Sequence, residues 1–216
     1  MHNRNHPCPL AERRCWVFDL DGTLTVAQHN FDDIRSALGI PPGHLILEYL
    51  DSLPARQAAP LRGRLDDIEA ALSTAARPAP GARELLTMLR ASGARLGILT
   101  RNTRDNALAA LGAAGLADFF AAEAVLGRGE AAPKPSADGI KQLLAAWNGA
   151  SDDGLMIGDV HLDLAAGRAA GVLTVHVSAG SHRRWPELTD HHLLSLSQLY
   201  DVLQGHNLKA AYARGR

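Results

Sequence analysis

Five short apolar runs, separated by segments with helical spacing, constrain the fold of this chain more than any other feature of its 216 residues. Each run has the length of a strand, and it lacks the polar alternation of a sheet with one face in water. A sheet covered by helices on both faces explains both features. The pattern predicts an α/β fold with a Rossmann-like parallel sheet as its core. The five runs are residues 15–20, 94–100, 122–127, 154–159 and 172–177.

The alternation of strands and helices is interrupted once. Residues 25–79 contain no convincing strand, and their apolar residues are spaced as in helices, with turns expected at 41–43 and near Pro54. We therefore expect a small all-helical cap inserted after the first strand, with hinges near 24–25 and 78–81. The predicted division is a flexible leader at 1–14, a core domain at 15–24 and 80–205, a cap domain at 25–79 and a C-terminal tail at 206–216.

Composition excludes several classes of partner. The net charge is -1 and no long basic stripe is present, so nucleic acid is not expected. No apolar run is long enough to span a bilayer, and no signal-peptide segment follows the N-terminus. The two cysteines, Cys8 and Cys15, are too few for a disulfide framework, which fits a reducing compartment. We expect a cytoplasmic protein without a membrane partner, and nothing indicates its oligomeric state.

Two carboxylates, Asp19 and Asp21, follow the first apolar run in the stretch VFDLDGTLT. Parallel α/β sheets bind ligands at the carboxyl ends of their strands, and Gly22 allows the backbone to turn there. Two neighbouring carboxylates coexist in the ionised form when a divalent cation lies between them and their ligand. Mg²⁺ prefers hard oxygen ligands together with waters and phosphate oxygens, so this pair predicts a Mg²⁺ site.

Other strand ends carry the remaining groups that phosphate chemistry needs. Asp159 follows the fourth run, and Asp163 lies four residues later, which would place both on one face of a starting helix. Thr100 supplies a hydroxyl, and Asn102 lies near a helix N-terminus that offers N–H groups to an anion. Lys134, between two prolines, supplies a cation. Together these residues form a constellation for metal-assisted phosphoryl transfer.

In the order and spacing of these motifs, the chain resembles the haloacid dehalogenase-like superfamily over roughly residues 15–180. The helical insert looks like the type-1 cap of that superfamily, in the branch that includes phosphoglycolate phosphatase. The motif DxDGT alone is moderately specific, whereas all four motifs in order are strongly so. These four are DLDGT at 19–23, Thr100 in LTRN, Lys134 in PKPS, and GDVHLD at 158–163.

The resemblance implies a role for each catalytic residue. Asp19 would be the nucleophile that forms an aspartyl-phosphate. Asp21 would be the general acid for the leaving alkoxide and then the general base for water. Thr100 would bind a phosphoryl oxygen, and Lys134 would balance the charge of Asp19 and the phosphate. The dehalogenases of the superfamily lack the second acid, so Asp21 favours phosphate chemistry.

The resemblance also implies the binding residues. Mg²⁺ would be held by the side chain of Asp19, the main-chain carbonyl of Asp21 and the side chain of Asp159. Asp163 would act behind these ligands or through a water molecule. The predicted substrate-binding residues are Gly22, Thr23, Arg101 and Asn102, with backbone N–H groups near Gly22 and Asn102 completing a phosphate cradle.

The expected function is a Mg²⁺-dependent phosphatase that hydrolyses a small phosphorylated metabolite. Within enzymes, the alternative is a phosphoglucomutase-like transferase, which would give an isomerised sugar phosphate instead of inorganic phosphate. Outside enzymes, the alternatives are a phospho-acceptor domain and a silent binding domain that kept the fold. The insert at 25–79 and the position of Asp21 argue against a phospho-acceptor, and the intact set of motif residues argues against a silent protein.

Overall fold

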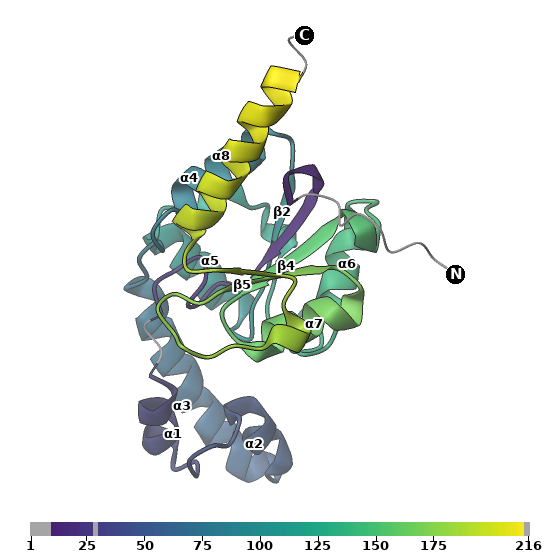
Figure 1. The fold of residues 1–216 in the computed structure, drawn as a ribbon. Helices are drawn as coiled ribbons and strands as arrows, with labels where there is room; N and C mark the ends of the chain where they lie inside the picture. Colours follow the sequence, from purple (N-terminus) through teal and green to yellow (C-terminus); the bar gives the residue numbers. More distant parts are fainter. Residues whose placement is uncertain (1–9, 28–29, 214–216) are drawn as a thin grey trace, which may run out of the picture.

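A six-stranded sheet forms the centre of the computed structural model, which describes residues 10–27 and 30–213, with side chains described as far as residue 205. The strand order is β3-β2-β1-β4-β5-β6, and every neighbouring pair is parallel (Figure 1). The predicted α/β fold with a parallel sheet is confirmed. The strands are β1 (Cys15–Phe18), β2 (Arg95–Leu99), β3 (Val125–Leu126), β4 (Gly154–Gly158), β5 (Leu173–Val177) and β6 (His191–Leu193).

Helices cover both faces of the sheet, on its two sides in Figure 1. The central strand β1 shows why its sequence lacks polar alternation. Trp16 and Phe18 pack into one hydrophobic core, Cys15 and Val17 pack into the other, and all four are buried. The first core includes α4 (Ala82–Ala91), α5 (Arg104–Ala113) and α8 (Leu196–Ala213), and the second includes α6 (Asp138–Ala146) and α7 (His161–Ala170).

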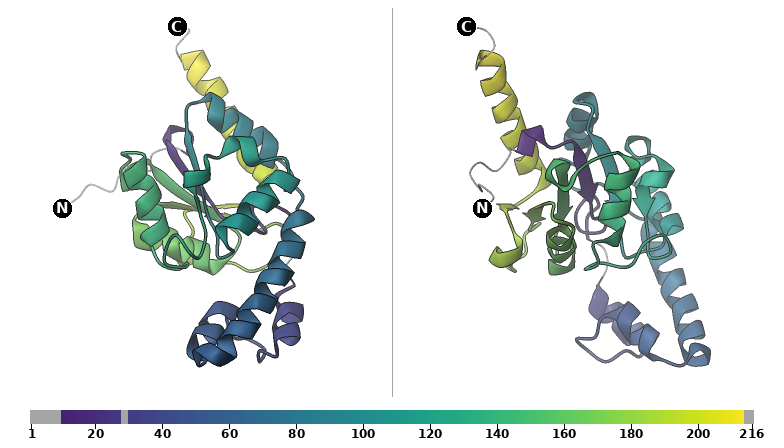
Figure 2. Two further views of the ribbon diagram at one scale, coloured as in Figure 1. Left: turned by 180° about the vertical axis from the view of Figure 1, so that it is seen from behind. Right: turned by 90° about the vertical axis from the view of Figure 1, so that its right-hand side faces the viewer.

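The segment between β1 and α4 folds into three helices that form the cap. The cap has a hydrophobic core of its own, built around Ile34, Leu50 and Leu65. Its third helix also contacts α5 of the core domain, and both views of Figure 2 show this long helix running from the cap alongside the core. The three helices are α1 (Phe31–Leu38), α2 (Ile46–Ser52) and α3 (Ala55–Thr74).

The two chain segments that join the cap to the core lie side by side. The Val26 N–H donates to the Arg77 carbonyl at 2.9 Å, and the Ala79 N–H donates to the Leu24 carbonyl at 2.8 Å. Thr25 and Pro78 form an antiparallel bridge. The expected hinge segments are therefore hydrogen-bonded to each other.

Local structure differs from the sequence expectations at both ends of the core domain. Leu10 is buried against the core, in a 3-10 helix at Leu10–Glu12, although it falls within the expected leader. The Arg14 N–H and carbonyl bond to the carbonyl of Asp153 and the N–H of Arg95, so residues 10–14 are held by the sheet. Helix α8 continues to Ala213, eight residues into the expected tail. Residues 1–9, which include Cys8, lie outside the described residues.

One helix contains a proline, and one strand is shorter than expected. Helix α3 begins at Ala55, directly after the turn expected near Pro54, and it contains Pro60. Strand β3 has two residues, because the preceding residues 122–124 form a 3-10 helix. The other 3-10 helices are Ala117–Phe119, Ser151–Asp153 and Pro186–Leu188. Within the described part of the chain, no helix combines the length and the apolar character that crossing a bilayer requires.

Candidate active site

Three adjacent strands deliver polar residues to one edge of the sheet. Asp19 follows β1 directly, Thr100 follows β2 and Asp159 follows β4, and β1 lies between the other two strands. Because all three strands are parallel, their carboxyl ends meet at the same edge. The cap helices and these strand ends enclose a cavity of about 330 Å³.

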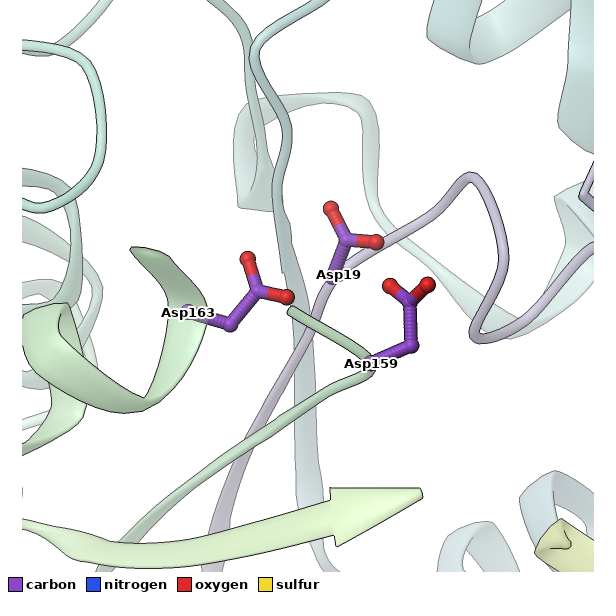
Figure 3. A group of neighbouring side chains, drawn as sticks. All are labelled: Asp19, Asp159 and Asp163. Atoms are coloured by element: carbon purple, nitrogen blue, oxygen red, sulfur yellow. The ribbon is translucent and has the colours of Figure 1, made fainter. Parts of the chain in front are cut away.

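A cluster of carboxylates lines this cavity. Asp19, Asp159 and Asp163 each contribute one oxygen, and these oxygens all lie within 4.8 Å of one another. Figure 3 shows the three carboxylates gathered around one space. Asp163 lies in the first turn of α7, whereas Asp159 precedes this helix by two residues. The loop between β4 and α7 brings these two acids together, rather than the shared helix face that was expected.

Lys134 reaches the carboxylate cluster from the loop after β3. Its Nζ lies 2.5 Å from Asp19 Oδ1 and 2.6 Å from Asp163 Oδ1, and its side chain is 3% exposed. Burial alone would lower the pKa of Lys134, but the carboxylates of Asp163 and Asp19 outweigh burial and raise it above its ordinary value. The lysine is therefore charged, and it pairs with two buried acids at once.

The carboxylates themselves are destabilised in their ionised forms. Burial raises the pKa of Asp19 well above its ordinary value, and Asp163 and Asp159 add to this effect against the opposing charge of Lys134. Burial also raises the pKa of Asp159 to about 7, with Asp163 adding to it. Three acids face one lysine, so negative charge is left uncompensated. Oxygen donors with excess negative charge fit a hard divalent cation such as Mg²⁺.

Gly22 and Thr23 shape the position of Asp159. Gly22 has a φ of +93°, and a Cβ at this position would lie 2.6 Å from Asp159 Oδ2. The Thr23 hydroxyl donates to Asp159 Oδ1 at 3.4 Å. Gly22 and Thr23 are not among the described residues that line the cavity. The Gly22 N–H donates to the Thr25 carbonyl at 3.0 Å. The arrangement therefore gives both residues a supporting position behind Asp159, which differs from the expected contact with substrate.

Thr100 and Asn102 both line the cavity where α5 begins. The Asn102 N–H donates to Thr100 Oγ1 at 3.1 Å, so this N–H is used within the loop and not offered to a phosphate. The amide oxygen of Asn102 accepts the N–H of Thr103 at 2.8 Å, and Thr103 caps α5 through the N–H of Asn106. The loop is held rigidly by these bonds. The expected site residues that line the cavity are Asp19, Asp21, Thr100, Arg101, Asn102, Lys134, Asp159 and Asp163.

Ion pairs between the cap and the core were not foreseen from the sequence. Arg101 Nη2 lies 2.7 Å from both carboxylate oxygens of Glu48 on α2, and its Nη1 donates to the Lys134 carbonyl at 3.2 Å. Arg128 Nη1 donates to Glu69 Oε1 of α3 at 3.2 Å. Acidic and basic residues occur throughout these segments, so no sequence signal pairs them.

Glu69 is the acid that the cap contributes to the cavity lining. Burial raises the pKa of Glu69 to about 7, the charges of Asp66 and Asp21 add to this effect, and Arg128 opposes it. Asp21 also lines the cavity, and it is near enough to Glu69 for its charge to raise the pKa of Glu69.

The fold is a parallel α/β sheet with a helical cap. Clustered acids and a buried lysine lie at the strand ends, and this combination defines a capped α/β hydrolase. The chain belongs to the haloacid dehalogenase-like hydrolase family, whose model matches residues 25–177. The resemblance seen in the motifs is thereby confirmed.

Individual relatives agree with this family. A phosphoglycolate phosphatase of Caulobacter vibrioides is 34% identical over 76% of this chain and 78% of its own length. An uncharacterized hydrolase of Saccharomyces cerevisiae is 27% identical over 88% of this chain and 91% of its own length. The crystal structure of a hydrolase from Pseudomonas syringae has a TM-score of 0.74 at 23% identity, and the match covers 89% of this chain and 99% of that chain. This structural likeness concerns the fold.

Proposed function

We propose that this protein is a Mg²⁺-dependent phosphatase that hydrolyses a small phosphomonoester through an aspartyl-phosphate on Asp19. The observation that carries this proposal is the contact of Lys134 with Asp19 beside two further carboxylates, in a cavity that the cap helices also line. The similarity to phosphoglycolate phosphatases supports phosphate chemistry in particular. The cytoplasm remains the predicted location.

In the first step, a carboxylate oxygen of Asp19 attacks phosphorus and the ester oxygen leaves. Lys134 favours the ionised form of Asp19 through its 2.5 Å contact, against the effect of burial. The same ammonium group neutralises part of the charge of the incoming phosphoryl group. Thr100, whose hydroxyl oxygen already accepts the Asn102 N–H, can donate its proton to a phosphoryl oxygen.

Asp21 transfers protons in both steps. Asp21 lines the same cavity two residues after Asp19, and in this proposal it protonates the leaving oxygen, which lies on the side away from the attacking carboxylate. In the second step, Asp21 takes a proton from the water that attacks phosphorus. This attack releases inorganic phosphate and regenerates Asp19.

Mg²⁺ would be held by the side chains of Asp19 and Asp159 and by the main-chain carbonyl of Asp21. When bound, it would withdraw negative charge from the phosphoryl oxygens. Asp163 has another task, because its Oδ1 pairs with Lys134 and its Oδ2 accepts the Val160 N–H at 3.1 Å. Asp163 thus fixes the lysine and the loop that carries Asp159.

The direct test is phosphate release from a panel of phosphomonoesters, with Mg²⁺ and with a chelator. Asp19→Asn should abolish turnover, because an amide cannot attack phosphorus, and no phosphoryl group should be trapped on the variant in rapid-quench mass spectrometry. Asp118→Asn, an exposed residue outside the cavity lining, is the matched control. Wild-type turnover by Asp19→Asn would refute the covalent route. Undiminished turnover in chelator would refute the metal requirement.

A further inference from the structure

We propose that the cap selects a substrate whose leaving group is short, uncharged and largely apolar. This inference rests on the proposed phosphatase function and names the class of phosphomonoester that the same cavity accepts. The acids and the lysine at the strand ends occupy one side of the cavity, whereas the cap lines the other side mainly with apolar side chains, together with Arg35 and Glu69.

The cap lines the cavity mainly with aliphatic and aromatic groups. Phe31 and Ile34 come from α1, Leu45 and Ile46 come from the start of α2, and Leu65 comes from α3. These residues lie in three different helical segments and converge on one space. A leaving group bonded to a phosphoryl group at Asp19 would project toward them, so its contacts would be apolar.

Two of these side chains are exposed, which is unusual for their type. Phe31 is 53% exposed and Leu45 is 44% exposed. In the described part of the chain, four large apolar side chains are exposed, and these two line the cavity while Val26 and Leu194 do not. Apolar surface that faces a ligand cavity is covered when a ligand binds, and an apolar ligand gains most from covering it.

The arginines at the cap side are already paired with acids. Arg35 of α1 lies 2.6 Å from Asp32, and Arg101 is held by both oxygens of Glu48. On the cap side, a carboxylate of the leaving group would have to displace one of these acids or lose its hydration against leucine and phenylalanine side chains. Displacing an acid gives up an existing ion pair, and losing hydration is unfavourable because a buried charge without a partner is strongly destabilised.

Glu69 brings an acid to the cavity wall that is held in an ion pair with Arg128, so this part of the wall offers no free cation to a second anion. One arginine of the lining behaves differently. Arg183 belongs to the core loop after β5, and among the described residues it has no carboxylate within 4 Å. It is the group through which an anionic leaving group would have to be bound, so it serves as a test of the opposite selectivity.

The size of the cavity limits the leaving group as well. A volume of about 330 Å³ is near the lower end of the range of roughly 300–1,000 Å³ for small-molecule sites. Part of this volume must hold the phosphoryl group. The remaining space suits a short aliphatic or single-ring alcohol.

The test compares two esters of matched shape, isobutyl phosphate and phosphoglycolate, with methyl phosphate as the reference. The two methyl groups of the isobutyl ester replace the two carboxylate oxygens of phosphoglycolate. We expect kcat/KM for isobutyl phosphate to exceed that for phosphoglycolate by about tenfold or more, since one apolar group in a fitted pocket is worth roughly 10–200-fold. Phe31→Ala and Leu45→Ala should reduce the ratio of isobutyl to methyl phosphate several-fold. Leu194→Ala, which removes an exposed leucine outside the cavity, should leave this ratio unchanged.

The outcomes separate the inference about the leaving group from the proposed phosphatase function. Preference for phosphoglycolate over isobutyl phosphate would overturn the inference while leaving the phosphatase function intact, and loss of that preference in Arg183→Ala would assign anion binding to Arg183. Equal ratios in Phe31→Ala, Leu45→Ala and wild type would also overturn it. No phosphate from any ester, methyl phosphate included, would refute the proposed function and the inference with it.

Discussion

Replacing Lys134 with methionine tests the electrostatic account of the site in the absence of any substrate. Methionine keeps most of the length of the side chain and removes its charge. Lys134 is 3% exposed and holds Asp19 and Asp163 at 2.5 and 2.6 Å, so both acids lose their buried partner in the variant. Asp159, within 4.8 Å of the other two acids, then repels them without any compensating cation.

The expected loss of stability follows from these contacts. Removing one partner of a buried ion pair costs about 3–5 kcal/mol, because the remaining charge is left without compensation. For a domain of this size, each kcal/mol lowers the melting temperature by roughly 2–4 °C, so a decrease on the order of 10 °C is expected. The loss should be smaller at low pH, where the acids accept protons, and smaller with Mg²⁺, which replaces the missing positive charge.

The assay is the free energy of unfolding from denaturant titration, measured in chelator at pH 8 and at pH 5.5 and then with Mg²⁺. Lys141→Met is the matched control, because Lys141 is exposed on α6. The control should change the free energy of unfolding by less than about 0.5 kcal/mol. If Lys134→Met is no less stable than Lys141→Met at pH 8 in chelator, the buried lysine does not hold the carboxylates together and the reasoning fails.

Three further predictions concern single groups. Gly22→Ala should weaken Mg²⁺ binding in calorimetric titrations, because its Cβ would lie 2.6 Å from Asp159 Oδ2. Gly43→Ala, with a similar φ of +81° and no neighbour within 4 Å, should leave Mg²⁺ binding unchanged. Equal Mg²⁺ affinity in both variants would contradict this prediction. The Mg²⁺ affinity of the wild type should fall by up to about tenfold for each pH unit below 7, because Asp159, with a pKa of about 7, must then lose a proton on binding. Equal affinities at pH 6 and pH 8 would argue against proton release from Asp159 on Mg²⁺ binding. Burial raises the pKa of Glu69 from 4.5 to about 7, so its ionisation disfavours the folded state as the pH rises through this window. Glu69→Gln should therefore gain up to about 3 kcal/mol of unfolding free energy relative to wild type between pH 4.5 and pH 8, and a constant difference would refute it.

The strand-end residues could be predicted from the sequence because they depend on few structural choices. Asp19, Thr100 and Asp159 each follow an apolar run directly. In a parallel sheet the carboxyl ends of the strands that precede these residues share one edge, and small errors in strand length do not move the residues away from that edge. Lys134 was expected from the motif order, and its contact with Asp19 agrees with that expectation.

The cap contacts could not be predicted, because they depend on how two bodies pack. Whether Glu48 meets Arg101 depends on the orientation of α2, which follows from the packing of α3 against α5. Local rules also failed where packing prevailed. Pro60 normally begins a helix or breaks one, yet α3 includes it at its sixth position.

The sequence also could not show which backbone N–H groups are already hydrogen-bonded within the loops of the site. The N–H groups of Gly22 and Asn102 lie where a phosphate cradle would be expected, but each is bonded within its own loop. A motif identifies which residues are present at a turn. It does not state which of their donors are already satisfied, since that depends on the closed geometry of the turn.

The central place of β1 in the sheet determines when the site can exist during synthesis. Residue 15 pairs with residue 95 on one side and with residue 154 on the other. A chain still emerging from the ribosome can complete the cap, whose core lies between residues 34 and 72, long before β1 has its second neighbour. Until β4 emerges, β1 presents an unpaired apolar edge that favours association with other chains. Chains truncated before residue 154 should therefore be aggregation-prone as well as inactive, because the second partner of the strand that carries Asp19 is also the strand that delivers Asp159.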